Sequence, residues 1–256
     1  MSIRPTKSVT TTTTTLEGAG VRLERAFGFG DTAEFDPFLL FDDFRNDAPE
    51  YYQAGFPWHP HRGMETITYV LAGTVDHGDS LGNKGTLVVG DVQWMTAGSG
   101  VVHSEMPSPE FFEKGGTMHG FQIWINLPSK QKMISPRYQD TPSEIIPQVI
   151  LEDGKSKVRV IAGEFKGIKA VIETNTPILY LHASLEPGVE LKHPVSIDNN
   201  IMAYLISGKG EFGENEDVNT AVEGQLVLFA HDGDSISLRS TIDSSMELRI
   251  LGGTPI

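Results

Sequence analysis

One pattern of strands and glycines occurs twice in this chain, and that repetition limits the folds open to it. Residues 69–73 (YVLAG) reappear as residues 204–208 (YLISG), and residues 90–95 (GDVQWM) reappear as residues 224–229 (GQLVLF). The two segments recur in the same order and at nearly the same spacing. A repeated unit of strands and turns predicts a duplicated β-domain.

The segments around the first copy are short and rich in strand-forming residues. We expect strands at residues 66–70, 86–89, 92–95 and 119–127, with dense turn residues at 79–85. Many short strands separated by glycine turns indicate an all-β barrel or sandwich. The threonine run at residues 10–15 suits either a mobile tail or an edge strand.

A few short helices and one domain boundary are expected in the middle of the chain. Pro128 suits a first helical turn and Pro136 would end the helix, so residues 128–134 are predicted to be helical. The proline-rich segment 136–147 is interpreted as a linker. We therefore predict an N-terminal domain at residues 1–134 and a C-terminal domain at residues 135–256.

Composition excludes several classes of function. The chain has 256 residues and a formal net charge of −14, which argues against binding to nucleic acid or to an anionic membrane surface. It has no cysteine, so disulfides and thiol chemistry are excluded. We find no apolar segment long enough to cross a bilayer and no secretory signal, and we expect a cytoplasmic protein.

Two pairs of metal-ligand residues flank the first repeat copy. His59 and His61 form one pair, and His103 and Glu105 form the other. In a strand, residues two apart lie on the same face, so each pair would point into one pocket. Three imidazoles and a carboxylate without a thiolate suit a divalent ion of iron, manganese, cobalt, nickel, copper or zinc.

A second carboxylate competes for the fourth position. Glu65 has the same strand parity as His59 and His61, and periodicity does not choose between Glu65 and Glu105. The other carboxylate would orient a ligand imidazole. Candidates for the pocket lining are Phe56, Trp58 and His119, while His77 is interpreted as a loop histidine.

The repeat predicts that the second half lacks this site. Carried across, the four ligand positions fall on Pro194, Ser196, Ser237 and Arg239. None of these can replace its counterpart as a ligand. His193 lies one residue out of register, and we interpret it as a loop or surface residue. The C-terminal domain is thus expected to be degenerate, without a metal.

At these residues the sequence resembles the pirin family of the cupin superfamily. The resemblance is carried by residues 38–44 (FLLFDDF), 59–66 (HPHRGMET), 90–98 (GDVQWMTAG) and 103–106 (HSEM). It implies a bicupin, that is, two stacked cupin (double-stranded β-helix) barrels, with one Fe(II) in the N-terminal barrel. It also implies that His59, His61, His103 and Glu105 are the ligands, so by resemblance Glu105 is preferred to Glu65.

The resemblance implies two functions of different classes. The first is a dioxygenase that opens flavonols such as quercetin, in which Glu105, or Glu65 beside it, accepts the proton of the substrate hydroxyl. The alternative is an iron-dependent, redox-sensing regulator that acts through a protein partner as a transcriptional cofactor. A monomer is expected in either case. A pocket of roughly 300 Å³ or more beside the metal would favour the enzyme.

Overall fold

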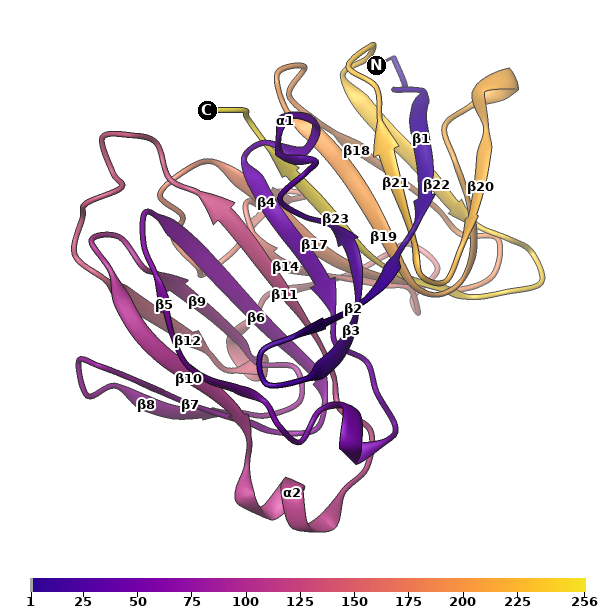
Figure 1. Ribbon diagram of the computed structural model, residues 1–256. Coiled ribbons are helices and arrows are strands. Elements are labelled where there is room, and N and C mark those ends of the chain that lie inside the picture. Colours follow the sequence, from indigo (N-terminus) through magenta and orange to yellow (C-terminus); the bar gives the residue numbers. More distant parts are fainter. Residues whose placement is uncertain (1) are drawn as a thin grey trace. The chain divides into compact units, whose positions relative to one another are not determined.

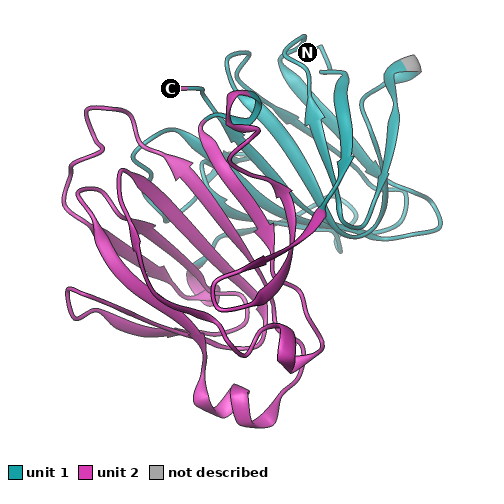
Figure 2. Ribbon diagram, viewed as in Figure 1, with its two compact units in different colours: residues 1–12, 34–36, 146–255 teal, residues 13–33, 37–145, 256 magenta. Residues whose placement is uncertain are grey.

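The computed structural model describes residues 2–256, except for the side chain of residue 216, and divides them into two compact units (Figure 2). The N-terminal unit comprises residues 13–33, 37–145 and 256, and the C-terminal unit comprises residues 2–12, 34–36 and 146–255. Both are built from antiparallel strands (Figure 1), as the short strand-like segments predicted. The α-helices are short: α1 (Thr32–Phe35) and α2 (Pro109–Lys114). Among residues 2–256, no helix combines the length and the apolar character needed to cross a bilayer.

The N-terminal unit contains two antiparallel sheets. The seven-stranded sheet has the order β12 (Arg137–Thr141), β9 (Val92–Thr96), β6 (Met64–Ala72), β11 (His119–Asn126), β4 (Phe38–Asp43), β3 (Val21–Phe27) and β2 (Thr13–Glu17). The four-stranded sheet has the order β5 (Phe56–His61), β10 (Val101–Pro107), β7 (Val75–Asp79) and β8 (Lys84–Leu87).

The seven-stranded sheet presents different side chains on its two faces. Thr68 pairs with Gln122 and Thr66 with Trp124, and this face looks toward the four-stranded sheet. The opposite face carries fully buried apolar side chains, among them Ile67, Tyr69, Phe121 and Ile123. Because alternate residues of a strand point to opposite faces, odd and even positions of β6 have different surroundings.

The C-terminal unit is organised around one ten-stranded sheet. Its main path is β1 (Thr6–Thr11), β21 (Gln225–Phe229), β19 (Asn200–Phe212), β23 (Met246–Gly253), β17 (Ile178–Leu185), β14 (Lys157–Ala162) and β13 (Gln148–Ile150). Off this path lie β18 (Glu190–Pro194), β20 (Asn219–Val222) and β22 (Ser235–Ser240), and a separate hairpin joins β15 (Glu164–Phe165) to β16 (Ile168–Lys169).

The sequence repeat corresponds to a repeated strand pairing. In the N-terminal unit Ile67 of β6 lies opposite Trp94 of β9, and in the C-terminal unit Met202 of β19 lies opposite Leu228 of β21. The glycine that ends each copy of the repeat has a positive φ, 85° at Gly73, just after β6, and 81° at Gly208, within β19. Glycine adopts this conformation without steric cost, so the same local backbone conformation recurs in both units.

The structure corrects two local expectations and decides between the two alternatives for the threonine run. Residues 128–134 form successive turns rather than a helix, with hydrogen bonds from Gln131 N to Pro128 O and from Ile134 N to Gln131 O. The expected linker contains β12, which pairs with β9, so the N-terminal unit continues to residue 145 rather than ending near residue 134. The threonine run is strand rather than tail, because β1 pairs with β21 and β2 with β3.

Candidate metal centre

The antiparallel pairing of β5 with β10 brings three histidines together. His59 lies directly opposite His103, and His61 lies opposite Val101. The register then shifts, because Glu105 faces Phe56 and the two residues between Phe56 and His59 face one residue of β10. Such a β-bulge re-aims side chains locally. All six residues of β5, from Phe56 to His61, line the pocket.

The histidine nitrogens converge on one point. The Nε2 atoms of His59 and His103 are 3.0 Å apart, and the ligand atoms of His59, His61 and His103 all lie within 4.8 Å of one another. Two nitrogens bound at right angles to one ion, each at about 2.1 Å, would be about 3.0 Å apart. The arrangement therefore fits neighbouring ligands of a single metal ion.

The protonation of the imidazoles also suits a metal. His59 Nδ1 is 2.8 Å from the carbonyl oxygen of Pro57, so Nδ1 carries the proton and the Nε2 lone pair points inward. Burial, together with the neighbouring His103 and His59, lowers the pKa of His61 to about 3. Burial likewise lowers the pKa of His103. Both rings are thus neutral near pH 7, which is the form that binds a metal.

The turn that follows His61 and the turn that precedes His103 are tied together. Gly63 N donates to Gly98 O at 2.7 Å, and Ser99 N donates to Ile134 O at 2.8 Å. Lys132 Nζ donates to Gly63 O at 3.0 Å. A Cβ at Gly98, whose φ is 51°, would lie 2.1 Å from Ile134 O. Only glycine fits there, and the 128–134 turns brace the approach to His103.

Glu105 lies beside the histidines without joining their tight group. Its side chain is buried, and its Oε1 accepts a hydrogen bond of 2.6 Å from Thr68 Oγ1. It lines the same pocket as His59 and His61. Its carboxylate is thus the acidic group that faces the histidine pocket from β10.

Glu65 lies on the other face of its strand. Gly63 has a φ of 69° and interrupts the strand between His61 and Met64, so strand parity does not continue from β5 into β6. Glu65 is fully buried, pairs with Thr96 and Ile125, and accepts a hydrogen bond of 2.7 Å from Thr96 Oγ1. This is the face of Ile67 and Tyr69, opposite to that of Thr68.

A pocket of about 440 Å³ opens beside the histidines. Its wall is largely aromatic and aliphatic, and it includes Phe29, Leu40, Phe44, Phe56, Trp58 and Trp124. The Trp124 ring packs 5.0 Å from His61 and 5.6 Å from Phe29. One corner is charged, because Arg25 pairs with Asp42 at 2.7 Å and with Glu17 at 2.9 Å. The wall suits a flat, largely apolar ligand with polar groups at its edge.

The expected lining residues separate into two groups. Phe56 and Trp58 line the pocket, and Trp58 is 61% exposed at its mouth. His119 does not line it. Its Nε2 instead lies 3.3 Å from Arg45 Nε and 3.4 Å from Asp43. His119 is the first residue of β11, whereas Gln122 and Trp124, which line the pocket, lie further along the same strand.

Other polar residues were missed or misinterpreted. Gln122 and Thr68 are within hydrogen-bond reach of each other next to Glu105. The sequence indicated them only as polar residues within largely apolar strands. His77 is not a loop residue. It lies buried on β7, stacked on Tyr138 and 3.4 Å from Asp140. It lies opposite Glu105 in the strand pairing, and this proximity could not be read from spacing.

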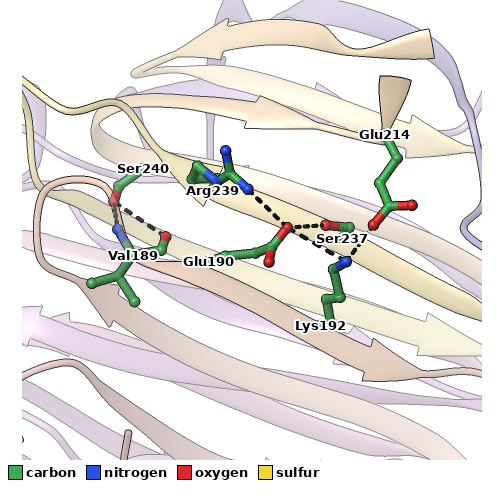
Figure 3. A network of polar contacts seen from close by, with 7 residues as sticks. All are labelled: Val189, Glu190, Lys192, Glu214, Ser237, Arg239 and Ser240. Atoms are coloured by element: carbon green, nitrogen blue, oxygen red, sulfur yellow. Dashed lines mark hydrogen bonds and ion pairs between the residues drawn. The ribbon is translucent and has the colours of Figure 1, made fainter. Parts of the chain in front are cut away.

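The corresponding strand pair of the C-terminal unit, β18 with β22, has a different interior. His193 lies opposite Ile236 and Leu191 opposite Leu238, and both leucines and the isoleucine belong to the apolar core. His193 is buried against Phe165, so its assignment to the surface was wrong. Lys192 and Ser237 lie in a network of polar contacts around Glu190 (Figure 3). Among the described side chains, those of residues 2–215 and 217–256, no second cluster of metal-ligand residues accompanies the one in the N-terminal unit.

Comparisons with known proteins agree with both halves of the chain. The family model described as Pirin matches residues 20–125, and the one described as Pirin C-terminal cupin domain matches residues 180–256. A pirin-like protein of Solanum lycopersicum is 43% identical over 240 residues, covering 94% of this chain and 78% of its own. A putative quercetin 2,3-dioxygenase of Pseudomonas aeruginosa is 39% identical, covering 94% and 83%. A solved structure of a quercetin 2,3-dioxygenase from Acinetobacter baumannii aligns with a TM-score of 0.91 at 32% identity, covering 99% of this chain and 88% of that one.

Proposed function

The chain belongs to the pirin family, with the bicupin fold of that family, and from this we propose that it is a mononuclear iron dioxygenase that opens flavonols such as quercetin. The observation that carries the proposal is the convergence of three imidazoles at one end of a largely apolar pocket. The names of the Pseudomonas and Acinetobacter relatives support the substrate class.

We assign His59, His61, His103 and Glu105 as the residues that would hold Fe(II). Nitrogen and carboxylate donors without a thiolate suit iron, and the same set also accepts manganese, cobalt, nickel, copper or zinc. Four protein donors leave two positions open on a six-coordinate ion. When bound, the ion would supply Lewis acidity and an electron path between a substrate and dioxygen.

The side chains around this centre have separate tasks in the proposal. Glu105 accepts the proton of the enolic hydroxyl of the substrate, since its carboxylate faces the pocket. Trp124 and Phe56 form walls that hold a flat ring system and keep water from it. The volume of about 440 Å³ exceeds the roughly 300 Å³ at the low end of ligand pockets. A substrate with fused aromatic rings can therefore enter.

One observation favours the alternative of a redox-sensing regulator. Phe29 and Trp58, at the pocket rim, are 68% and 61% exposed. Exposed aromatic side chains beside a metal centre could contact a protein partner, and aromatic residues are enriched at such interfaces. A regulator of this kind does not require a substrate pocket, whereas the pocket of about 440 Å³ behind these residues suits an enzyme.

The test is aerobic turnover by protein reconstituted with Fe(II). We expect several equivalents of quercetin to disappear per iron, with one dioxygen consumed for each quercetin. His61→Ala should abolish the reaction, and His193→Ala, in the C-terminal unit, should retain it. A protein that holds iron through its histidines and yet does not consume quercetin would overturn the dioxygenase proposal and favour the regulator.

A further inference from the structure

Glu105 is held by a hydroxyl from the opposite sheet. Thr68 lies on β6 of the seven-stranded sheet and Glu105 on β10 of the four-stranded sheet. Thr68 Oγ1 is 2.6 Å from Glu105 Oε1, and both side chains are buried. A hydroxyl bound to a carboxylate at this distance forms a short, charge-assisted hydrogen bond. One oxygen of Glu105 is therefore occupied before any ligand enters.

The same hydroxyl also contacts Gln122. Thr68 Oγ1 is 2.8 Å from the atom placed as Oε1 of Gln122, which lies directly opposite Thr68 on β11. A hydroxyl has one proton to donate and can accept from a second partner. The single proton of Thr68 cannot serve both oxygens, and because a carboxylate is the stronger acceptor we infer that Thr68 donates to Glu105. Its contact with Gln122 is then satisfied only if the amide oxygen and nitrogen of Gln122 are exchanged, so that the nitrogen donates to Thr68.

This order fixes the direction of the Gln122 side chain. The oxygen and nitrogen of an amide have nearly the same shape, and the hydrogen-bond partners decide which is which. With the nitrogen directed at Thr68, the carbonyl oxygen turns away from it. Gln122 lines the main pocket together with Glu105 and Trp124. The pocket therefore receives an acceptor next to the carboxylate.

We propose that Thr68 is a positioning residue that holds Glu105 as a one-oxygen ligand, and that Gln122 presents its carbonyl oxygen to a hydroxyl of the pocket's ligand. The inference rests on the proposed assignment of Glu105 as the fourth ligand. The proposed ligand of the pocket is a hydroxylated aromatic molecule that places one hydroxyl at Glu105 and another at Gln122.

A one-oxygen carboxylate keeps the centre open. Three imidazoles and one carboxylate oxygen occupy four of six positions, whereas a carboxylate bound through both oxygens would occupy a fifth. Thr68 competes for Oε1 and so preserves the extra position. Residues that orient a ligand in this way commonly change metal affinity by about 10- to 100-fold when they are altered.

The first test uses Co(II), which reports its ligands through its visible spectrum, and needs neither substrate nor dioxygen. Thr68→Val keeps the shape of the side chain and removes the hydroxyl. We expect its Co(II) affinity to fall about 10-fold and its spectrum to change. Thr68→Ser should restore both. Thr66→Val, the same substitution at the buried threonine two residues earlier, should behave as the wild type.

Thermal unfolding of each apo variant shows whether the fold is retained. Wild-type affinity and an unchanged spectrum in a folded Thr68→Val protein would overturn the positioning role. The result is separable from the enzyme assay. If the iron protein fails to open quercetin and Thr68→Val still weakens Co(II) binding, the dioxygenase proposal fails and the positioning role of Thr68 stands.

The second test measures ligand choice without oxygen. Quercetin and 3-hydroxyflavone share one ring skeleton, and the latter lacks all hydroxyls but one. We expect the Co(II) protein to bind quercetin about 10-fold more tightly, because a missing hydroxyl leaves the Gln122 acceptor unpaired. Gln122→Met should bind the two compounds alike. An undiminished preference in Gln122→Met would overturn the role given to Gln122.

Discussion

The inward positions of one strand pair differ completely between the two units. In the N-terminal unit, β5 and β10 present His59, His61, His103 and Glu105 to the interior. In the C-terminal unit, β18 and β22 present Leu191, His193, Ile236 and Leu238. The neighbouring strands keep the same pairing in both units, as Ile67 with Trp94 and Met202 with Leu228 show. One backbone pattern can therefore enclose either a polar centre or an apolar core.

The two interiors have opposite consequences for stability. Burial of imidazoles and a carboxylate without full pairing costs free energy, and a bound metal offsets that cost. Burial of aliphatic side chains stabilises the fold by about 25 cal/mol per Å² of apolar surface. The N-terminal unit should thus depend on its metal, whereas the C-terminal unit should not.

The largest expected effect comes from removing a ligand. His61→Ala should lower metal affinity at least about 1,000-fold, equivalent to about 4 kcal/mol. His193→Ala, its matched control in the C-terminal unit, should leave the affinity unchanged. Isothermal titration with Co(II) measures both. Equal losses of metal affinity in the two variants would mean that the metal site is not confined to the N-terminal unit.

The two glycines with positive φ, Gly73 and Gly208, offer a second comparison. Alanine at either Gly73 or Gly208 must adopt a positive φ, which costs roughly 1–2 kcal/mol. At Gly208 the added Cβ would also lie 1.9 Å from the backbone oxygen of Ser245, whereas at Gly73 it meets the flexible Met118 side chain at 3.0 Å. Overpacking adds about 1–3 kcal/mol.

Gly208→Ala should therefore lower the free energy of unfolding by about 3 kcal/mol, clearly more than Gly73→Ala does. Urea denaturation of the two variants gives the difference. Equal losses of unfolding free energy would show that the contact with Ser245 adds nothing to the cost at Gly208.

Metal binding should protect one unit selectively. At a free metal concentration of 100 Kd, the site adds about 2.7 kcal/mol to the stability of the state that binds it. Amide hydrogen exchange should slow in β5, β6, β9 and β10 and change little in β18 and β22. Equal protection of both strand groups would contradict a site confined to the N-terminal unit.

The smallest effect concerns a histidine of the C-terminal unit. Burial, followed by the charges of Arg249 and Arg159, lowers the pKa of His182 to about 3, although Glu247, which accepts a hydrogen bond from it, acts in the opposite direction. Between that value and about 6.5 the unfolded chain binds a proton that the folded chain does not. Stability is therefore present above pH 6.5 and is lost as pH falls.

The loss at pH 5 should be about 2 kcal/mol relative to pH 7. His182→Gln should flatten the pH profile of the apo protein by that amount, measured as urea midpoints from pH 7 to pH 5. An identical slope in the variant and the wild type would exclude His182 as its source.

Local spacing predicted the parts of the site that lie within one strand. His59 and His61 share a face because they are two residues apart in β5, and the glycine turns of the repeat predicted the strand pattern. Parity failed for Glu65 because Gly63 interrupts the strand. The offset of the sequence repeat predicted that Ser237 occupies a position equivalent to a ligand. The strand pairing instead places Ile236 opposite His193, whose side chain points into the interior.

The pocket could not be predicted from spacing at all. Trp124 on β11 is distant in sequence from Arg25 on β3 and Leu40 on β4, and only the pairing of β11 with β4 brings it beside them. The Thr68–Glu105 contact likewise crosses from one sheet to the other. Such contacts depend on how sheets face each other, which a single sequence does not specify.

The most direct measurement is the anomalous diffraction of crystals of the full chain loaded with Co(II). A single strong peak per chain is predicted, within bonding distance of Nε2 of His59, His61 and His103 and of one oxygen of Glu105. The β18–β22 interior around His193 should show none. A peak at His193, or none between the three histidines, would contradict the account.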